Sequence, residues 1–140
     1  MKYMTRDFGE VDAAEEEILK FTQPIFGFED CKRYMLLRDE EIGESIAFLQ
    51  SLDRREVCFT LFDPSGLSDV FQPRLPPQTD SLLGQGELHC WVIGVVPEDF
   101  RETTVNLKSP VFINTETRLG AQMILEQEYP VRYPLMKGAK

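Results

Sequence analysis

The stretch of residues 103–125 constrains the fold most, because it repeats short alternating runs separated by residues that interrupt a strand. Residues 105–108, Val-Asn-Leu-Lys, alternate apolar with polar side chains, which is the two-residue period of a half-buried β-strand. Pro110 cannot donate a hydrogen bond within a sheet, so it marks the start, the edge or a bulge of a strand. Residues 114–120 supply turn chemistry before the alternation resumes. The stretch is therefore predicted as strand, break, strand, turn, strand.

Similar runs occur along the rest of the chain. The other segments predicted as strands or extended chain are residues 2–8, 33–37, 46–49, 57–62, 88–96 and 129–135. Residues 10–21 fit either a helix, whose first turn an acidic run favours, or a short strand that ends before Pro24, and we prefer the strand. Residues 79–83 can form one helical turn within an otherwise irregular, proline-rich segment.

Strand after strand with short turns predicts an all-β protein. We expect a small antiparallel β-barrel of about nine to ten strands with one or two short helical turns, since closure removes exposed sheet edges. A two-sheet sandwich is the alternative. The length of 140 residues suits one domain, which we place at residues 1–135, with a disordered tail at residues 136–140.

The charge balance restricts the partners that the chain can have. Its net charge is −9, which argues against nucleic-acid binding because phosphates require a basic surface. The longest apolar run, residues 91–96, is far shorter than the roughly 20 residues of a membrane-spanning helix. No signal-type segment opens the chain. We therefore expect a cytoplasmic protein with no membrane partner and no direct nucleic-acid partner.

The chain offers little material for catalysis. His89 is the only histidine, so every serine–histidine or cysteine–histidine arrangement would depend on it, and no recognisable motif surrounds it. Its neighbour Cys90 would lie on the opposite face of a strand, whereas metal sites need three or four convergent ligands. Cys58 and Cys90 lie in apolar runs and are expected to pack as small hydrophobes. We expect no catalytic residues, no metal and no cofactor.

Two kinds of loop are candidates for protein recognition. The loop at residues 24–28 carries three large apolar side chains, which either fold beneath it as a plug or form an exposed patch for a partner. Acidic runs at residues 15–17 and 39–41 are either solvated turns or a field that attracts a basic partner. In the stretch described first, Asn106, Lys108 and Asn114 either stabilise turns through side-chain hydrogen bonds or contact a partner.

The sequence resembles the bacterial flagellar assembly factor FliW family from residue 8 to residue 135. The segments that carry the resemblance are residues 24–29, 48–51, 56–57, 63–64, 104–108, Pro110, 113–114, Gln122, 124–125, 129–132 and 134–135. Two departures stand out. Ser109 occupies a position where the family usually carries alanine, and the segment at residues 72–79 looks particular to this chain, so no partner contact is carried onto it.

The resemblance implies a non-enzymatic β-barrel that binds two proteins. FliW-like proteins bind flagellin and also the RNA-binding translational repressor CsrA; free FliW occupies CsrA and relieves repression of flagellin translation until flagellin accumulates. The candidate protein-binding residues are Glu15, Glu16, Glu17, Phe26, Phe28, Asp39, Glu40, Glu41, Asn106, Lys108 and Asn114. The alternatives are a small-molecule-binding barrel, with Phe26, Phe28 and Trp91 lining a pocket, and a general flagellar export chaperone.

Overall fold

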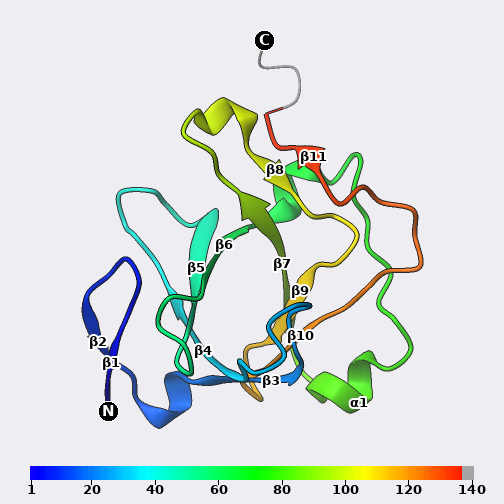
Figure 1. The fold of residues 1–140 in the computed structure, drawn as a ribbon. Helices are drawn as coiled ribbons and strands as arrows, with labels where there is room; N and C mark the ends of the chain where they lie inside the picture. The colour runs from blue at the N-terminus through cyan, green and yellow to red at the C-terminus, as the bar shows by residue number, and fades with distance from the viewer. Residues whose placement is uncertain (137–140) are drawn as a thin grey trace.

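Seven strands close into a barrel in the computed structural model, which describes residues 1–136 (Figure 1). The barrel order is β7-β6-β5-β4-β3-β10-β9, and β9 pairs with β7 to complete the circuit. The strands of the barrel are β3 (Leu19–Gln23), β4 (Arg33–Leu37), β5 (Ile46–Ser51), β6 (Cys58–Phe62), β7 (Leu88–Val95), β9 (Val111–Asn114) and β10 (Leu119–Gln122). The predicted all-β barrel is confirmed, and the sandwich is not formed.

The remaining elements pack outside the barrel. They are β1 (Lys2–Met4), β2 (Glu10–Asp12), β8 (Thr104–Val105), β11 (Tyr133–Pro134), α1 (Thr79–Leu83) and the 3-10 helices η1 (Glu15–Glu17), η2 (Pro64–Leu67) and η3 (Phe100–Glu102). The β1–β2 hairpin, at the left of Figure 1, covers β4 and β5, while β8 and β11 extend the sheet beyond β7. Residues 137–140 of the expected tail lie outside the described residues.

Alternating side chains divide the protein into an interior core and outer cores. Along β7, Trp91 and Ile93 face the barrel interior, whereas Val92 packs outward against the segments at residues 64–71 and 125–135. The interior core consists of Leu19, Phe21, Ile25, Cys31, Tyr34, Ala47, Leu49, Val57, Leu61, Trp91, Val111 and Ile113. The barrel interior is therefore filled by side chains, as the period of two requires.

One pairing departs from the expected antiparallel arrangement. β3 lies parallel to β10, with Lys20 opposite Leu119 and Phe21 opposite Gly120. The ring of Phe21 covers Gly120 so closely that a Cβ atom there would lie 2.5 Å from the ring. Glycine is needed at position 120 because the Phe21 ring occupies the space that any other side chain would fill. The parallel pair joins segments about a hundred residues apart and closes this side of the barrel.

Several predicted segments differ in detail from their expected form. The last strand of residues 103–125 already begins within the predicted turn, as β10, and only Tyr133–Pro134 of residues 129–135 form a strand. Residues 2–8 form a strand only up to Met4, because the hydroxyl of Thr5 donates to the Gly9 carbonyl and turns the chain. Residues 10–21 contain β2, η1 and part of β3, so the acidic run does open a helical turn and a strand follows it. The strand expected through residue 108 ends at Val105, where the chain enters a turn.

Candidate functional site

One end of the barrel brings together two of the segments that the sequence singled out for recognition, the loop at residues 24–28 and the turn that carries Asn106 and Lys108. β3, β5, β7 and β10 end there, and β4, β6 and β9 begin there, as their pairings require. We call this end the barrel mouth. The loop between β3 and β4, the turn between β5 and β6, and the turn at residues 106–110 all lie around it.

The loop at residues 24–28 combines the two predicted roles, plug and exposed patch. Ile25 is buried in the interior core, and Phe28 is half-buried with its ring edge-on to Phe59 at a centroid distance of 5.0 Å. Phe26 points away and is 80% exposed. Gly27, with φ of 91°, permits the reversal that sends the flanking aromatic side chains in different directions. The loop therefore plugs the barrel and also presents one aromatic side chain to solvent.

A groove of about 400 Å³ lies beside Phe26 at the barrel mouth. We call it the mouth groove; it is lined by Ile25, Phe26, Phe28, Phe59, Ile93, Asn106, Ser109, Gln122, Ile124 and Val131. Ile124 and Val131 are 63% and 58% exposed. Single exposed apolar residues are ordinary, but several around one concavity are typical of an interaction surface.

Hydrogen bonds hold the walls of the mouth groove in place. The Gln122 side chain accepts from the Phe26 N–H at 2.7 Å and donates to the Ser109 carbonyl at 3.1 Å. The Asn106 side chain accepts from the N–H groups of Lys108 and Ser109, both at 3.0 Å. The loop that carries Phe26 and the turn at residues 106–110 are thus joined through one buried amide.

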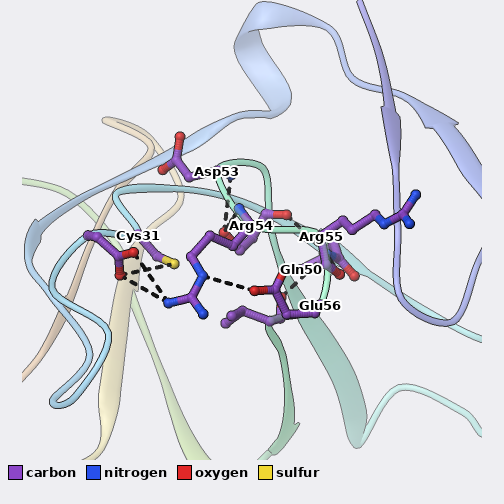
Figure 2. A network of polar contacts seen from close by, with 9 residues as sticks. Cys31, Gln50, Asp53, Arg54, Arg55 and Glu56 are labelled. Carbon is purple, nitrogen blue, oxygen red and sulfur yellow. Dashed lines mark hydrogen bonds and ion pairs between the residues drawn. The ribbon is translucent and has the colours of Figure 1, made fainter.

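The turn between β5 and β6 forms a second rigid part of the mouth. Figure 2 shows Arg54 extending from this turn between Cys31 and Glu56. Its guanidinium forms ion pairs with Glu56 at 3.0 Å and with Asp30 at 3.3 Å. The carboxylate of Asp53 accepts from the Lys32 and Arg33 N–H groups at 2.8 and 2.9 Å. These contacts fasten the turn to the start of β4.

The electrostatics of this turn favour the ionised carboxylate of Asp53. Partial burial alone would raise its pKa, but the two backbone N–H groups and the Arg33 guanidinium together hold the pKa below its ordinary value. The same ion pair raises the pKa of Arg33, chiefly through its hydrogen bond to Asp53. The pair is therefore charged at neutral pH and links β4 to the turn between β5 and β6.

The two acidic runs lie apart from each other and from the mouth groove. Glu15, Glu16 and Glu17 form η1 and are exposed, and the Glu17 side chain accepts from the Ala14 N–H at 2.9 Å. The run at residues 39–41 follows the end of β4 and so lies at the opposite end of the barrel from the mouth. The structure does not bring the acidic residues together into one patch.

The second acidic run is part of a turn. Asp39 is half-buried, and its side chain accepts from the Glu41 N–H at 3.0 Å. Glu40 and Glu41 are exposed, and neither is part of an ion pair within the described residues 1–136. Their charges are therefore available to solvent, while the carboxylate of Asp39 stabilises the backbone.

The three polar candidates in residues 103–125, Asn106, Lys108 and Asn114, lie in different surroundings. Asn114 is fully buried at the end of β9, with its amide donating to the carbonyls of Leu83 and Gln85. Lys108 is half-buried and donates to the Gln127 carbonyl at 2.9 Å. Only Asn106 lines the mouth groove. Of the two roles that the sequence allowed for Asn114, the structure shows stabilisation through side-chain hydrogen bonds, because its amide holds α1 against the barrel.

Trp91 does not line a pocket with Phe26 and Phe28. It is 1% exposed in the interior core and stacks on His89 at a centroid distance of 4.6 Å. His89 in turn lies 3.5 Å from the Asp63 carboxylate. Within residues 1–136, no group of three or more His, Cys, Asp or Glu side chains is arranged to hold a metal ion. No helix in the same part of the chain has the length and hydropathy needed to cross a bilayer.

Ile124 and Val131 are groove residues that sequence reasoning missed. Ile124 comes directly after the buried Met123 and before the buried Leu125, so the alternation itself places it outward. An isoleucine at an outward position was the available signal. Phe59 and Ile93 looked like ordinary strand residues, and only the barrel closure brings them to the mouth.

Comparison with known proteins agrees with this architecture. The family model described as FliW protein matches residues 2–135. The flagellar assembly factor FliW of Lachnoclostridium phytofermentans is 37% identical, with 96% of this chain and 90% of that protein covered. The protein of the same name from Natranaerobius thermophilus is 33% identical over 96% and 92% of the two chains.

A solved structure shares the fold along almost the whole chain. The crystal structure of a flagellar assembly factor FliW superposes with a TM-score of 0.88 at 30% identity, covering 96% of each chain. The sequence resemblance at residues 8–135 and the barrel are thus found together in one group of proteins. This chain belongs to the FliW family.

Proposed function

We propose that this protein is a flagellar assembly factor that binds flagellin and a CsrA-type translational repressor, one at a time. The observation that carries the proposal is the family match over residues 2–135, with relatives named flagellar assembly factors. While free, the protein occupies the repressor and permits flagellin translation. Accumulating flagellin recaptures it and restores repression. This role places the protein in the cytoplasm, requires no catalysis and no cofactor, and involves no direct contact with nucleic acid or membrane.

The distribution of surface features supports two kinds of contact. The mouth groove offers exposed apolar side chains, which suit a partner with a complementary apolar surface. The exposed carboxylates at Glu40 and Glu41 and in η1 suit the basic surface that an RNA-binding repressor must have. A negative protein bound next to that surface would lower the affinity of the repressor for RNA by like-charge repulsion.

The filled interior favours this role over a small-molecule-binding barrel. The space beneath the loop at residues 24–28 is occupied by Ile25 and by the half-buried ring of Phe28, and Trp91 is enclosed in the core. The mouth groove is open to solvent and shallow in comparison with a site that encloses a ligand. A general export chaperone differs from the proposal in its range of substrates, and the next experiment separates the two.

Capture assays with purified proteins test the proposed partner exchange. Flagellin and the repressor are each added to the immobilised protein, first separately and then together with increasing flagellin. We expect each to be retained alone, and the retained repressor to fall as flagellin rises. An unrelated flagellar export substrate serves as the control and should not be retained. The proposal would be contradicted if either flagellin or the repressor were not retained, or if all three proteins formed a stable complex.

Charge reversal at the acidic turn tests the electrostatic part. Glu40→Lys with Glu41→Lys should weaken repressor binding roughly tenfold at low salt and leave flagellin binding unchanged, because only the first contact depends on these charges. Asp39 is kept, since its side chain supports the turn. The matched control, Asp69→Lys with Glu87→Lys, makes the same change in net charge elsewhere on the surface. Isothermal titration calorimetry of both variants gives the comparison, and equal repressor affinities would exclude a role for this turn.

A further inference from the structure

Residues 72–77, which we call the proline segment, run extended along the side of the barrel and lead into α1 (Figure 1). Residues 71–76 belong to no helix or strand. Pro73, Pro76 and Pro77 hold their own φ at about −65° and keep the residue before each of them in an extended conformation. This is the backbone of a polyproline II helix, which has no hydrogen bonds of its own.

The exposure of the side chains in the proline segment repeats every three residues. A polyproline II helix has three residues per turn, so residues three apart share one edge. Pro73 and Pro76 are half-buried and form the edge nearest the barrel. Arg74 and Pro77 are exposed on a second edge, and Leu75, on the third, is 53% exposed. Two of the three edges therefore face solvent.

Side chains on either side of the proline segment hold its backbone in place. The Gln127 amide accepts from the Arg74 N–H at 2.8 Å and donates to the Gln72 carbonyl at 2.9 Å. At the other end, the Thr79 hydroxyl donates to the Pro76 carbonyl at 2.6 Å. Because it is held at both ends, the segment loses little freedom when a partner binds to it.

The free backbone groups of the proline segment are mostly acceptors, which decides how a partner can bind. Its three prolines have no N–H group, and the N–H groups of Gln72 and Arg74 donate to Tyr129 and Gln127 at 3.0 and 2.8 Å. No donor among residues 1–136 reaches the carbonyl oxygens of Arg74 and Leu75. An added β-strand needs donors as well as acceptors, whereas a groove that recognises a polyproline II helix does not.

Arg74 supplies a charge by which a partner can be selected. Its guanidinium is part of no ion pair among residues 1–136, although Glu126 lines the same cleft of about 200 Å³ beside the segment. Leu75, Pro76 and Pro77 form the apolar part of the lining of this cleft. A complementary groove therefore combines aromatic side chains, which pack on leucine and proline and donate to carbonyl oxygens, with a carboxylate for the guanidinium.

We propose that the proline segment is the docking site for a protein domain whose aromatic-lined, acidic groove recognises polyproline II helices. Leu75 and Pro77 pack against the aromatic side chains of the groove, and Arg74 pairs with its carboxylate. This contact goes beyond the proposed function, because it adds a third partner and uses neither the mouth groove nor the acidic runs at residues 15–17 and 39–41.

A titration with a probe domain tests this inference. The full-length protein is labelled with nitrogen-15, and its amide resonances are recorded while a purified SH3 domain with acidic residues beside its aromatic groove is added. We expect saturable shifts at the amides of Gln72, Arg74, Leu75 and Gln78. The same SH3 domain with its groove carboxylates replaced by lysine should bind at least about tenfold more weakly, because Arg74 then meets a like charge.

Variants of the protein separate the proline segment from the rest of the surface. Leu75→Ala with Pro77→Ala should weaken binding of the SH3 domain by about tenfold or more, since both apolar contacts are removed. Ile42→Ala, which changes an exposed apolar residue elsewhere, should alter it less than about twofold. Thermal melts verify that both variants are folded, as expected for exposed positions.

The outcomes are distinct from those that decide the proposed function. The inference is overturned if the SH3 domain causes no saturable shifts, if the shifts lie outside the proline segment and its contacts, or if the double variant binds as well as wild type. It is also overturned if flagellin or the repressor shifts the same resonances, because the segment then belongs to their contacts. Saturable binding that the double variant and the lysine-substituted SH3 domain both lose supports it. Whether the protein binds flagellin and the repressor is decided by the capture assays alone.

Discussion

Two buried amides each join parts of the chain that are distant in sequence. Gln50, fully buried in β5, accepts from the Arg6 N–H at 3.0 Å and donates to the carbonyl of Arg55 at 2.9 Å, so it fixes the amino-terminal hairpin to the turn between β5 and β6. Asn114 performs the same task for α1, since it donates to Leu83 and Gln85. A buried amide with partners on both its atoms stabilises one arrangement, because any other leaves it unsatisfied.

Replacement of Asn114 should therefore reduce stability and not binding. Asn114→Ala removes the acceptor of the Glu116 and Thr117 N–H groups, at 2.9 and 3.0 Å, as well as the donor to Leu83. We expect the free energy of unfolding to fall by about 2 kcal/mol. Urea denaturation followed by Trp91 fluorescence measures it. Thr115→Ala, at the exposed next position, is the control and should unfold near the wild-type midpoint; a matching midpoint for Asn114→Ala would refute the assignment.

At the scale of single elements, the turn between β5 and β6 depends on an ionised carboxylate. The pKa of Asp53 is lowered in the folded protein because the Lys32 and Arg33 N–H groups and the Arg33 guanidinium together outweigh the opposing effect of burial. A lowered folded pKa stabilises the protein above the unfolded pKa of about 4, and this stabilisation is lost as pH falls through the folded value.

Asp53→Asn should consequently change the acid dependence of stability. At pH 7 the variant should be less stable than wild type by about 1 kcal/mol, a modest value because the pair is partly exposed to solvent. The difference should shrink as pH falls below the unfolded pKa and vanish below the lower folded pKa, where Asp53 of the folded wild type is protonated as well. Thermal melts from pH 7 to acid conditions measure it, with Asp69→Asn as a control at an exposed position. A difference that stays constant with pH would show that the charge of Asp53 is not involved.

The strands were predictable where local alternation decides the structure. β4, β5, β6 and β7 lie within a residue or two of their expected ranges, because each has one face in the interior core and one outside. The parallel pairing of β3 with β10 was not predictable, since it depends on a contact between Phe21 and Gly120 that no local pattern reveals. Alternation with a period of two also does not predict turns that a side chain caps, such as the turn after Val105, where the Asn106 side chain accepts from two backbone N–H groups.

The candidate site was predictable only in part. Phe26 and Phe28 were recognised from a glycine-containing apolar loop, but nothing local says that one is exposed and the other half-buried. That division follows from the barrel, which accepts Ile25 and Phe28 as a plug. Asn114 carried the same polar signal as Asn106, yet it is buried, because burial of an asparagine depends on carbonyls supplied by a distant helix.

At the scale of the whole molecule, the three thiols report on how tightly the protein is packed. Cys31 and Cys58 are buried and Cys90 is half-buried. Burial raises the pKa of Cys58 to about 11 and, together with the nearby Asp63 charge, raises the pKa of Cys90 to about 12. Only the thiolate is nucleophilic, so both groups should be unreactive while the protein is folded.

Alkylation kinetics give a measurement of this packing. At pH 8 we expect Cys58 and Cys90 to react with iodoacetamide at least about a hundredfold more slowly than an exposed thiol, which the variant Thr115→Cys supplies as the reference. Unfolding in urea should abolish the difference. The label is located by peptide mass spectrometry. If either native thiol reacted as fast as the reference, the outer faces of β6 and β7 would be open to solvent.

The parallel pairing of β3 with β10 also has a consequence for biosynthesis. Lys20 pairs with Leu119, so β3 has no partner on one side until the ribosome has made nearly a hundred further residues. At translation rates of about 5 to 20 residues per second, this delay is roughly 5 to 20 s. The nascent chain can form the β4–β5–β6 meander meanwhile, but the seam can close only after β10 emerges. Closure of this seam is thus a late step of folding, and contacts of such long range slow it.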